Sequence, residues 1–167
     1  MSRDTPSPPA ILDVEASGFG RDSYPIEVGY VLPDGRARCT LIRPAPGWVH
    51  WDPQAEAVHH IPREAVLRHG REVGDVARWL NEELGGLTVY TDGWAHDYPW
   101  LSALFEEAGC SWRFKLDSLR SLLDEQEATH WHALKQQVGR ELKLERHRAS
   151  ADARLLQSTY LRLKHPP

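Results

Sequence analysis

The chain has 167 residues, of which 41% are hydrophobic and 26% are charged, and its formal net charge is −4. This length suits one domain, and the apolar content is too high for a disordered chain. No apolar run approaches the ~20 residues that span a bilayer, which argues against a membrane protein. The first residues lack the apolar core of a secretory signal, so we expect a cytoplasmic protein.

Prolines and charged residues are distributed unevenly along the chain. The prolines near the start predict a flexible N-terminal arm over residues 1–9, followed by a single domain over residues 10–167. Residues 134–167 contain eight Lys and Arg and three Asp and Glu, a formal charge of +5, so the remainder carries −9. A basic end on an acidic body is typical of a solvated helix surface, or of a segment that binds an acidic partner.

The first half of the domain is predicted to be rich in strands. Three apolar runs have the length of strands: residues 10–16, 26–32 and 37–42. The turn Pro33-Asp34-Gly35 joins the last two as a hairpin. The proline-rich residues 44–61 are predicted to be irregular, and Pro62 suits the first position of a helix.

In the second half, helices are predicted to alternate with two short strands, at residues 87–90 and 114–116. Helices are predicted to begin at Asp75 and Pro99, to cover residues 131–142, and to begin again at Ser150. A hairpin followed by alternating strands and helices predicts an α/β fold with a mixed sheet flanked by helices.

Two carboxylates interrupt the first predicted strand. Asp13 and Glu15 are two residues apart, so their side chains point to the same face of that strand. They repel each other there unless a divalent cation, which prefers carboxylate oxygens, lies between them or the face is wet. Asp97 follows the predicted strand at 87–90, where α/β sheets place their sites and where Asp also serves as a helix N-cap.

A further acid and a histidine come late in the chain. His147 is predicted in a loop and Asp152 in the first turn of the last helix, where an acid also stabilises the helix N-terminus. His147 alone is equally compatible with a surface histidine. Together, four carboxylates and one histidine are the groups that two-metal phosphoryl chemistry uses, with neutral histidine taking a proton from water.

Three segments resemble the motifs of the DEDDh 3′–5′ exonucleases, which include ribonuclease T, oligoribonuclease and the proofreading subunit of bacterial DNA polymerase III. The segments are residues 13–19, 94–101 and 147–153, and the resemblance runs from about residue 10 to residue 164. The spacing His147-x-Ala149-x-x-Asp152-Ala153 is its most specific feature. The second motif departs from the family, because residues 92–97 lack its usual Asn and Phe.

This resemblance implies a ribonuclease H-like fold with a mixed five-stranded sheet flanked by helices. It also implies two Mg²⁺ or Mn²⁺ ions held by Asp13, Glu15, Asp97 and Asp152, with His147 as the general base. The implied reaction is metal-dependent hydrolysis of single-stranded DNA or RNA, or of short oligonucleotides, from the 3′ end to nucleoside 5′-monophosphates.

Substrate contacts are expected beside these motifs, at Ser17, Gly18, Phe19, His59 and Trp94. In relatives, an apolar or aromatic residue at the place of Phe19 packs on the terminal base, whereas an isolated hydrophobic loop residue equally packs against its own sheet. Near the second motif, Asp92 is interpreted as a turn residue rather than a ligand.

Other functions compete with this hypothesis. One is a non-catalytic nucleic-acid-binding module that keeps the exonuclease fold. Another is a zinc enzyme using histidines that lack an accompanying Cys or His-Glu-x-x-His pattern: His59, His60, His130 and His132. A homodimer is a further hypothesis, in which the basic end of one subunit guides substrate to the other.

Overall fold

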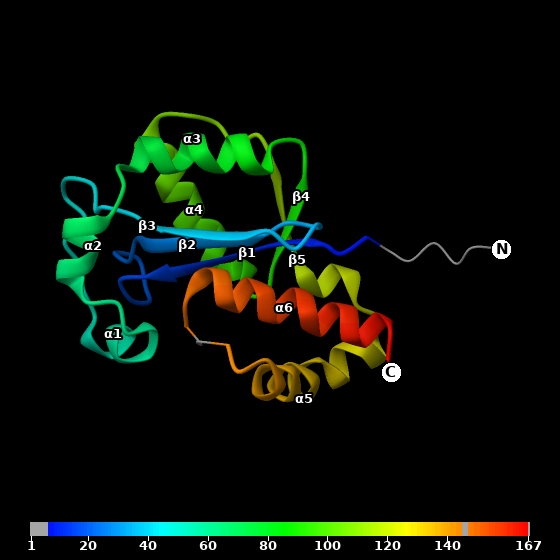
Figure 1. Cartoon of the computed structure of the whole chain (residues 1–167). Helices are drawn as coiled ribbons and strands as arrows, with labels where there is room; N and C mark the ends of the chain where they lie inside the picture. The colour runs from blue at the N-terminus through cyan, green and yellow to red at the C-terminus, as the bar shows by residue number, and fades with distance from the viewer. Residues whose placement is uncertain (1–6, 145–146, 167) are drawn as a thin grey trace.

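A five-stranded sheet forms the centre of the molecule (Figure 1). The computed structural model describes residues 7–144 and 147–166. The strands are β1 (Ala10–Ala16), β2 (Pro25–Val31), β3 (Ala37–Leu41), β4 (Thr88–Thr91) and β5 (Lys115–Ser118), in the spatial order β3-β2-β1-β4-β5. β1 pairs antiparallel with β2, and β2 with β3, whereas β4 is parallel to both β1 and β5. The predicted α/β architecture with a mixed five-stranded sheet is therefore confirmed.

Helices cover both faces of this sheet. In Figure 1, α3 and α4 lie above the sheet, α5 and α6 lie below it, and α1 and α2 lie at one end. The helices are α1 (Pro53–His59), α2 (Arg63–His69), α3 (Val73–Leu84), α4 (Trp94–Ala108), α5 (Glu125–Leu142) and α6 (Ala149–Lys164), with a short 3-10 helix, η1 (Leu119–Leu122). Within the described ranges, no helix is both long enough and apolar enough to cross a membrane.

The alternation of side chains along β1 creates two separate cores. Leu12 and Val14 belong to the core that includes Leu80 of α3 and Leu101 of α4. Ile11, on the other face, belongs to the core that α6 and α5 cover. Asp13 and Glu15 share this second face with Ile11, because residues two apart on a strand point the same way. The fold therefore directs both carboxylates toward the α6 side of the sheet.

Two helices begin where the sequence did not predict them. α1 lies inside the segment predicted to be irregular, because the Asp52 side chain accepts a hydrogen bond from the Gln54 amide (2.8 Å) and Pro53 occupies the first turn. α4 begins at Trp94, so Pro99 lies inside the helix instead of opening it. A proline this close to the helix start removes a single backbone hydrogen bond, which the buried apolar stripe of α4 offsets.

Other helix boundaries shift by a few residues. α5 begins at Glu125, earlier than predicted, because Asp124 and Glu127 form a reciprocal capping box. Asp75 and Ser150 lie within the first turns of α3 and α6 and are not their N-caps. Of the predicted arm, residues 1–6 lie outside the described residues. Pro9 is buried, and its carbonyl accepts a hydrogen bond from the Gln157 side chain (2.9 Å).

Candidate active site

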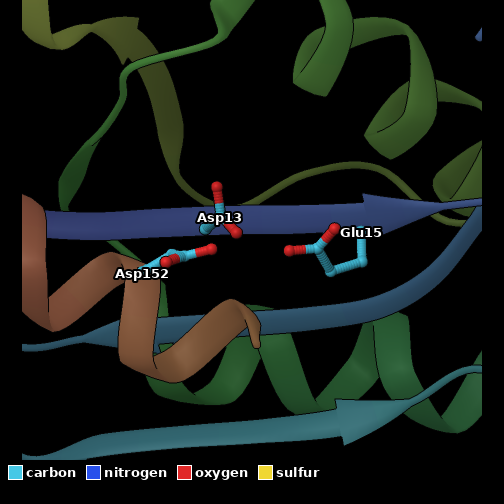
Figure 2. Close-up of side chains that lie close together, drawn as sticks. All are labelled: Asp13, Glu15 and Asp152. Atoms are coloured by element: carbon cyan, nitrogen blue, oxygen red, sulfur yellow. The ribbon is translucent and has the colours of Figure 1, made fainter. Parts of the chain in front are cut away.

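Three carboxylates from opposite ends of the chain meet beneath the sheet. Asp13 and Glu15 project from β1, and Asp152 projects from the first turn of α6 toward them (Figure 2). One carboxylate oxygen of each residue lies within 4.8 Å of an oxygen of the other two. We call Asp13, Glu15 and Asp152 the acidic trio.

A fourth carboxylate reaches the same cleft from the other side. Asp97 lies in the first turn of α4 and is only 4% exposed. Its carboxylate accepts a hydrogen bond from the hydroxyl of Thr91, at the end of β4. Asp97 lies outside the acidic trio but lines the same cleft, of about 510 Å³. The four acids predicted from the sequence therefore converge on one open cavity.

The proximity of these acids opposes their ionisation. Burial and the neighbouring charge of Asp152 raise the pKa of Glu15 to about 8. Burial, followed by the charges of Asp97, Glu15 and Asp152, raises the pKa of Asp13 well above its usual range. Burial also raises the pKa of Asp97 to about 7, although the hydrogen bond from Thr91 opposes this shift. Such perturbed acids in a cleft are typical of functional sites.

The donor set fits a hard divalent cation. A cation between carboxylates replaces their mutual repulsion with attraction, and Mg²⁺ and Mn²⁺ prefer oxygen ligands of this kind. Across residues 7–144 and 147–166, the acidic trio is the one group of three side chains close enough to share an ion. The described structure therefore gathers none of the histidines of the zinc hypothesis into such a group.

His147 is near Asp152 in the sequence but is not part of the cleft lining. It lies in the turn before α6, is partly buried and has a positive φ of 63°. The cleft is lined by Asp152 but not by His147. The structure therefore places the four acids around one cleft, whereas His147 does not line that cleft.

The predicted substrate contacts divide into two groups. Gly18, Phe19 and His59 line the cleft, whereas Ser17 and Trp94 do not. Phe19 is 68% exposed, so its ring is available to a ligand. Ser17 is fully buried, accepts a hydrogen bond from the Tyr24 amide (3.1 Å) and shares another with His50 Nδ1 (3.0 Å). Ser17 therefore supports the loop that carries Gly18 and Phe19.

His59 and Trp94 are held in different ways. His59 is buried, its Nδ1 accepts a hydrogen bond from the Ile61 amide (3.0 Å), and its Nε2 has no hydrogen-bond partner among the described residues. Burial lowers its pKa, so the ring is held neutral. Trp94 is 42% exposed and packs on Tyr98, with ring centroids 4.9 Å apart.

His96 and Asp92 are among the cleft residues that were not predicted as part of the site. His96 lines the cleft in a cluster of three rings: its ring centroid lies 5.4 Å from that of Phe19 and 5.8 Å from that of Trp100, and the Phe19 and Trp100 centroids lie 6.2 Å apart. Its position directly before Asp97 is the only signal that the sequence offered. Asp92 also lines the cleft, where the Lys135 ammonium of α5 pairs with it at 2.9 Å. This ion pair compensates the charge of Asp92, which was interpreted from the sequence as a turn residue and not as a ligand.

Much of the basic C-terminal segment is used in ion pairs within the chain. The described pairs are Lys135–Asp92, Arg148–Glu27, Arg162–Glu141 and Lys164–Glu127. Each of these cations belongs to α5, to α6 or to the turn between them. Four of the eight basic residues of the segment therefore pair with acids of the same chain in the described structure.

Solved structures of exonuclease I share this arrangement of sheet and helices. The enzyme from Methylocaldum szegediense aligns over 94% of this chain with a TM-score of 0.71 and 15% sequence identity. Exonuclease I of E. coli in complex with a dA16 oligonucleotide aligns over 94% with a TM-score of 0.70 and 13% identity. The chain has the fold of exonuclease I. The ribonuclease H-like fold that the sequence resemblance implied is thereby confirmed.

This exonuclease fold accounts for part of each neighbour. The chain spans 40% of the length of the Methylocaldum szegediense protein and 41% of that of the E. coli complex. A zinc-bound complex of E. coli exonuclease I with single-stranded DNA aligns with a TM-score of 0.66 at 13% identity, over 94% of this chain and 40% of that one. No protein-family model and no curated protein match the sequence.

Proposed function

We propose that the protein is a metal-dependent 3′–5′ exonuclease that releases nucleoside 5′-monophosphates from single-stranded nucleic acid or short oligonucleotides. One observation carries this proposal: the acidic trio and Asp97 converge on one open cleft within the exonuclease I fold. We propose further that residues 10–167 act as a single exonuclease domain.

Asp13, Glu15, Asp97 and Asp152 are proposed to hold two Mg²⁺ or Mn²⁺ ions. The clustering of the acidic trio and the raised pKa of Glu15 support this assignment. Both reflect the cost of placing carboxylate charges close together, and bound cations remove that repulsion. Bound divalent cations lower the pKa of water and neutralise the charge that develops on a phosphodiester. Asp13, central among the four acids, is proposed to contact both ions.

His147 is proposed to accept the proton of the attacking water, because neutral imidazole is an effective base near pH 7. Its place in the turn before α6 puts it on the same segment as Asp152. His147 does not line the cleft, so this role requires its side chain to rotate toward the cleft when substrate binds.

The exposed aromatic rings at the cleft are proposed to bind the bases at the 3′ end. Phe19 is largely exposed in the lining of the cleft that holds the acids, and stacking of a base on an aromatic ring tolerates any base. Gly18 and His59 also line the cleft and are proposed to contact the substrate there. Trp94 is proposed as a second stacking residue, outside the cleft lining.

Digestion of labelled oligonucleotides tests the proposal. Single-stranded DNA, RNA and a dinucleotide, each labelled at the 5′ end, are incubated with Mn²⁺ or with EDTA. We expect stepwise shortening with Mn²⁺, no shortening with EDTA, and none for a substrate whose 3′ end is blocked by phosphate. Asp13→Ala should remove the activity and leave the protein folded.

The same assay separates the alternatives. Binding of oligonucleotides without shortening, in Mn²⁺ and at any pH, contradicts the nuclease and supports the non-catalytic binding module. Shortening by the Asp13→Ala protein in EDTA contradicts the metal mechanism. Sedimentation of the active protein tests the homodimer proposal, which a fully active monomer contradicts.

A further inference from the structure

A buried acid outside the acidic trio holds the start of the helix that carries Asp152. Glu27, on β2, is 0% exposed. Its Oε1 accepts a hydrogen bond from the Ala149 amide (2.7 Å), the first residue of α6. The Arg148 guanidinium donates to both oxygens, from Nε at 3.2 and 3.0 Å and from Nη2 at 2.6 Å. One side chain therefore binds two consecutive residues at the helix N-terminus.

The register of the sheet explains why this anchor lies beside the acidic trio. Glu27 is paired with Glu15, and Gly29 is paired with Asp13. Residues directly opposite each other on antiparallel strands share a face of the sheet. The N-terminus of α6 therefore lies over Glu27 and Gly29, the strand partners of Glu15 and Asp13.

Gly29 allows the helix to come this close. A Cβ atom on Gly29 would lie 2.5 Å from the Ser150 amide nitrogen and 2.7 Å from the Ala149 carbonyl carbon. Both are backbone atoms of the first turn of α6, which cannot yield as a flexible side chain would. Gly29 thus leaves room for the first turn of α6, and Glu27 binds the N-terminus of that helix.

Both oxygens of Glu27 are already used by protein donors, so its chemistry differs from that of the acidic trio. A carboxylate that receives a backbone amide and a bidentate guanidinium has its charge compensated within the protein. Glu27 accordingly lies outside the group of residues that could share an ion. It acts on the helix and not on a ligand in the cleft.

We propose that Glu27 is a positioning residue that sets the place of Asp152 in the acidic trio by anchoring Arg148 and the Ala149 amide. This inference rests on the proposed function, since it assigns Asp152 to the metal site. Partners that orient metal ligands typically change metal affinity or activity 10–100-fold when they are removed. The anchor also fixes the residue next to His147, in the same turn.

Substitution of Glu27 by Gln tests the anchor with little change in volume. We expect Glu27→Gln to lower the affinity for Mn²⁺, measured by electron paramagnetic resonance, and kcat on a single-stranded oligothymidine by about 10–100-fold, with KM nearly unchanged. Hydrogen exchange of the amides from Ala149 to Ala153 should become faster, while exchange at the end of α6 stays as in the wild type.

Glu127→Gln is a matched control, because it breaks the Lys164–Glu127 ion pair at the opposite end of α6 (2.6 Å). Gln at this position keeps the capping box of α5, which accepts Glu or Gln. We expect this control to retain wild-type Mn²⁺ affinity and kcat. An equal loss in the control would mean that general loosening of α6 explains the effect, and would overturn the positioning role.

The outcomes separate the two proposals. A folded, active Glu27→Gln protein with unchanged Mn²⁺ affinity overturns the inference alone. A wild-type protein that binds no Mn²⁺ overturns the proposed function, and the role of Glu27 at a metal site with it. If Glu27→Gln does not fold, Arg148→Lys decides, because Lys keeps the charge of the partly exposed Arg148 but cannot make the bidentate contact. Unchanged Mn²⁺ affinity and kcat in Arg148→Lys would overturn the inference.

Discussion

The hydroxyl of Thr91 donates a hydrogen bond to the carboxylate of Asp97, and both side chains are buried. Thr91 ends β4 and Asp97 lies in the first turn of α4, so the bond joins the sheet to the helix at the cleft. It also stabilises the ionised form of Asp97 against the burial that raises its pKa to about 7.

Thr91→Val should weaken metal binding at neutral pH. Without the donor, the pKa of Asp97 rises further, so more of this acid is protonated at pH 7. Hydrogen bonds to charged groups contribute about 1.5–3 kcal/mol, so we expect Mn²⁺ affinity to fall about tenfold at pH 7 and less at pH 9. Calorimetric titration measures this. Thr159→Val, which removes a buried hydroxyl bonded to the Leu155 carbonyl, should leave affinity unchanged. A loss that is equal at both pH values would contradict this explanation.

The stability of the metal-free protein should depend on pH through Glu15. Its pKa is about 8 in the folded protein and near 4.5 when unfolded, so between these values the folded state binds more protons. The free energy of unfolding that Glu15 contributes is therefore fully present below pH 4.5 and is lost as pH rises to about 8. One such group changes stability by at most ~1.4 kcal/mol per pH unit.

Urea unfolding in EDTA at pH 5.5, 7 and 8.5 measures this dependence, with Glu15→Gln as the control that cannot titrate. We expect the wild-type protein to lose more stability than Glu15→Gln as pH rises. Mn²⁺ added at pH 8.5 should stabilise the wild type by binding the folded state. Parallel pH profiles for the two proteins would show that Glu15 titrates normally.

Gly29→Ala should displace the N-terminus of α6. Its methyl group would overlap backbone atoms of Ala149 and Ser150, and overpacking of this kind costs about 1–3 kcal/mol of stability. Because Asp152 lies in the same turn, nuclease activity should fall more than stability does. Gly74→Ala is the matched control, since its methyl group would meet only the far end of the Arg78 side chain, at 3.4 Å. Thermal unfolding and oligonucleotide digestion check both variants. Full activity of Gly29→Ala would show that the helix has room to adjust.

Phe19→Ala should weaken substrate binding without affecting the fold. The ring is 68% exposed and lines the cleft, and stacking on a base contributes about 1–3 kcal/mol. We therefore expect kcat/KM to fall about 5- to 150-fold while the unfolding temperature stays constant. Val49→Ala, equally exposed at 71% but outside the cleft lining, should have no effect. A wild-type kcat/KM for Phe19→Ala would place base binding elsewhere.

Local periodicity predicted the sheet and the orientation of its acids. The period of two along β1 was enough to place Asp13 and Glu15 on one face, and the structure confirms that placement. α1 was missed in the proline-rich stretch, because the Asp52–Pro53 pair that starts the helix is also typical of a turn. Pro99 was misinterpreted in the opposite way, since tertiary packing holds α4 helical on both sides of it.

The meeting of β1 with α6 could not be predicted from periodicity. Asp152 was connected to Asp13 by resemblance to a family motif, because no local pattern shows which helix docks on which strand. The contacts that make the docking possible, Glu27 with Arg148 and Gly29 with Ser150, join residues from distant parts of the chain. Asp92 likewise needed the structure, which supplies Lys135 from α5 as its partner.

The separation of Asp13 and Asp152 along the chain has a consequence for biosynthesis. Asp13 belongs to β1 and Asp152 to α6, so the acidic trio exists only after α6 has docked on β1. Contacts between such distant segments form late, because the chain between them must be ordered first. A growing polypeptide in which α6 has not yet docked on β1 therefore lacks the complete acidic trio. The order of these elements would delay formation of the proposed metal site until the two distant segments have met.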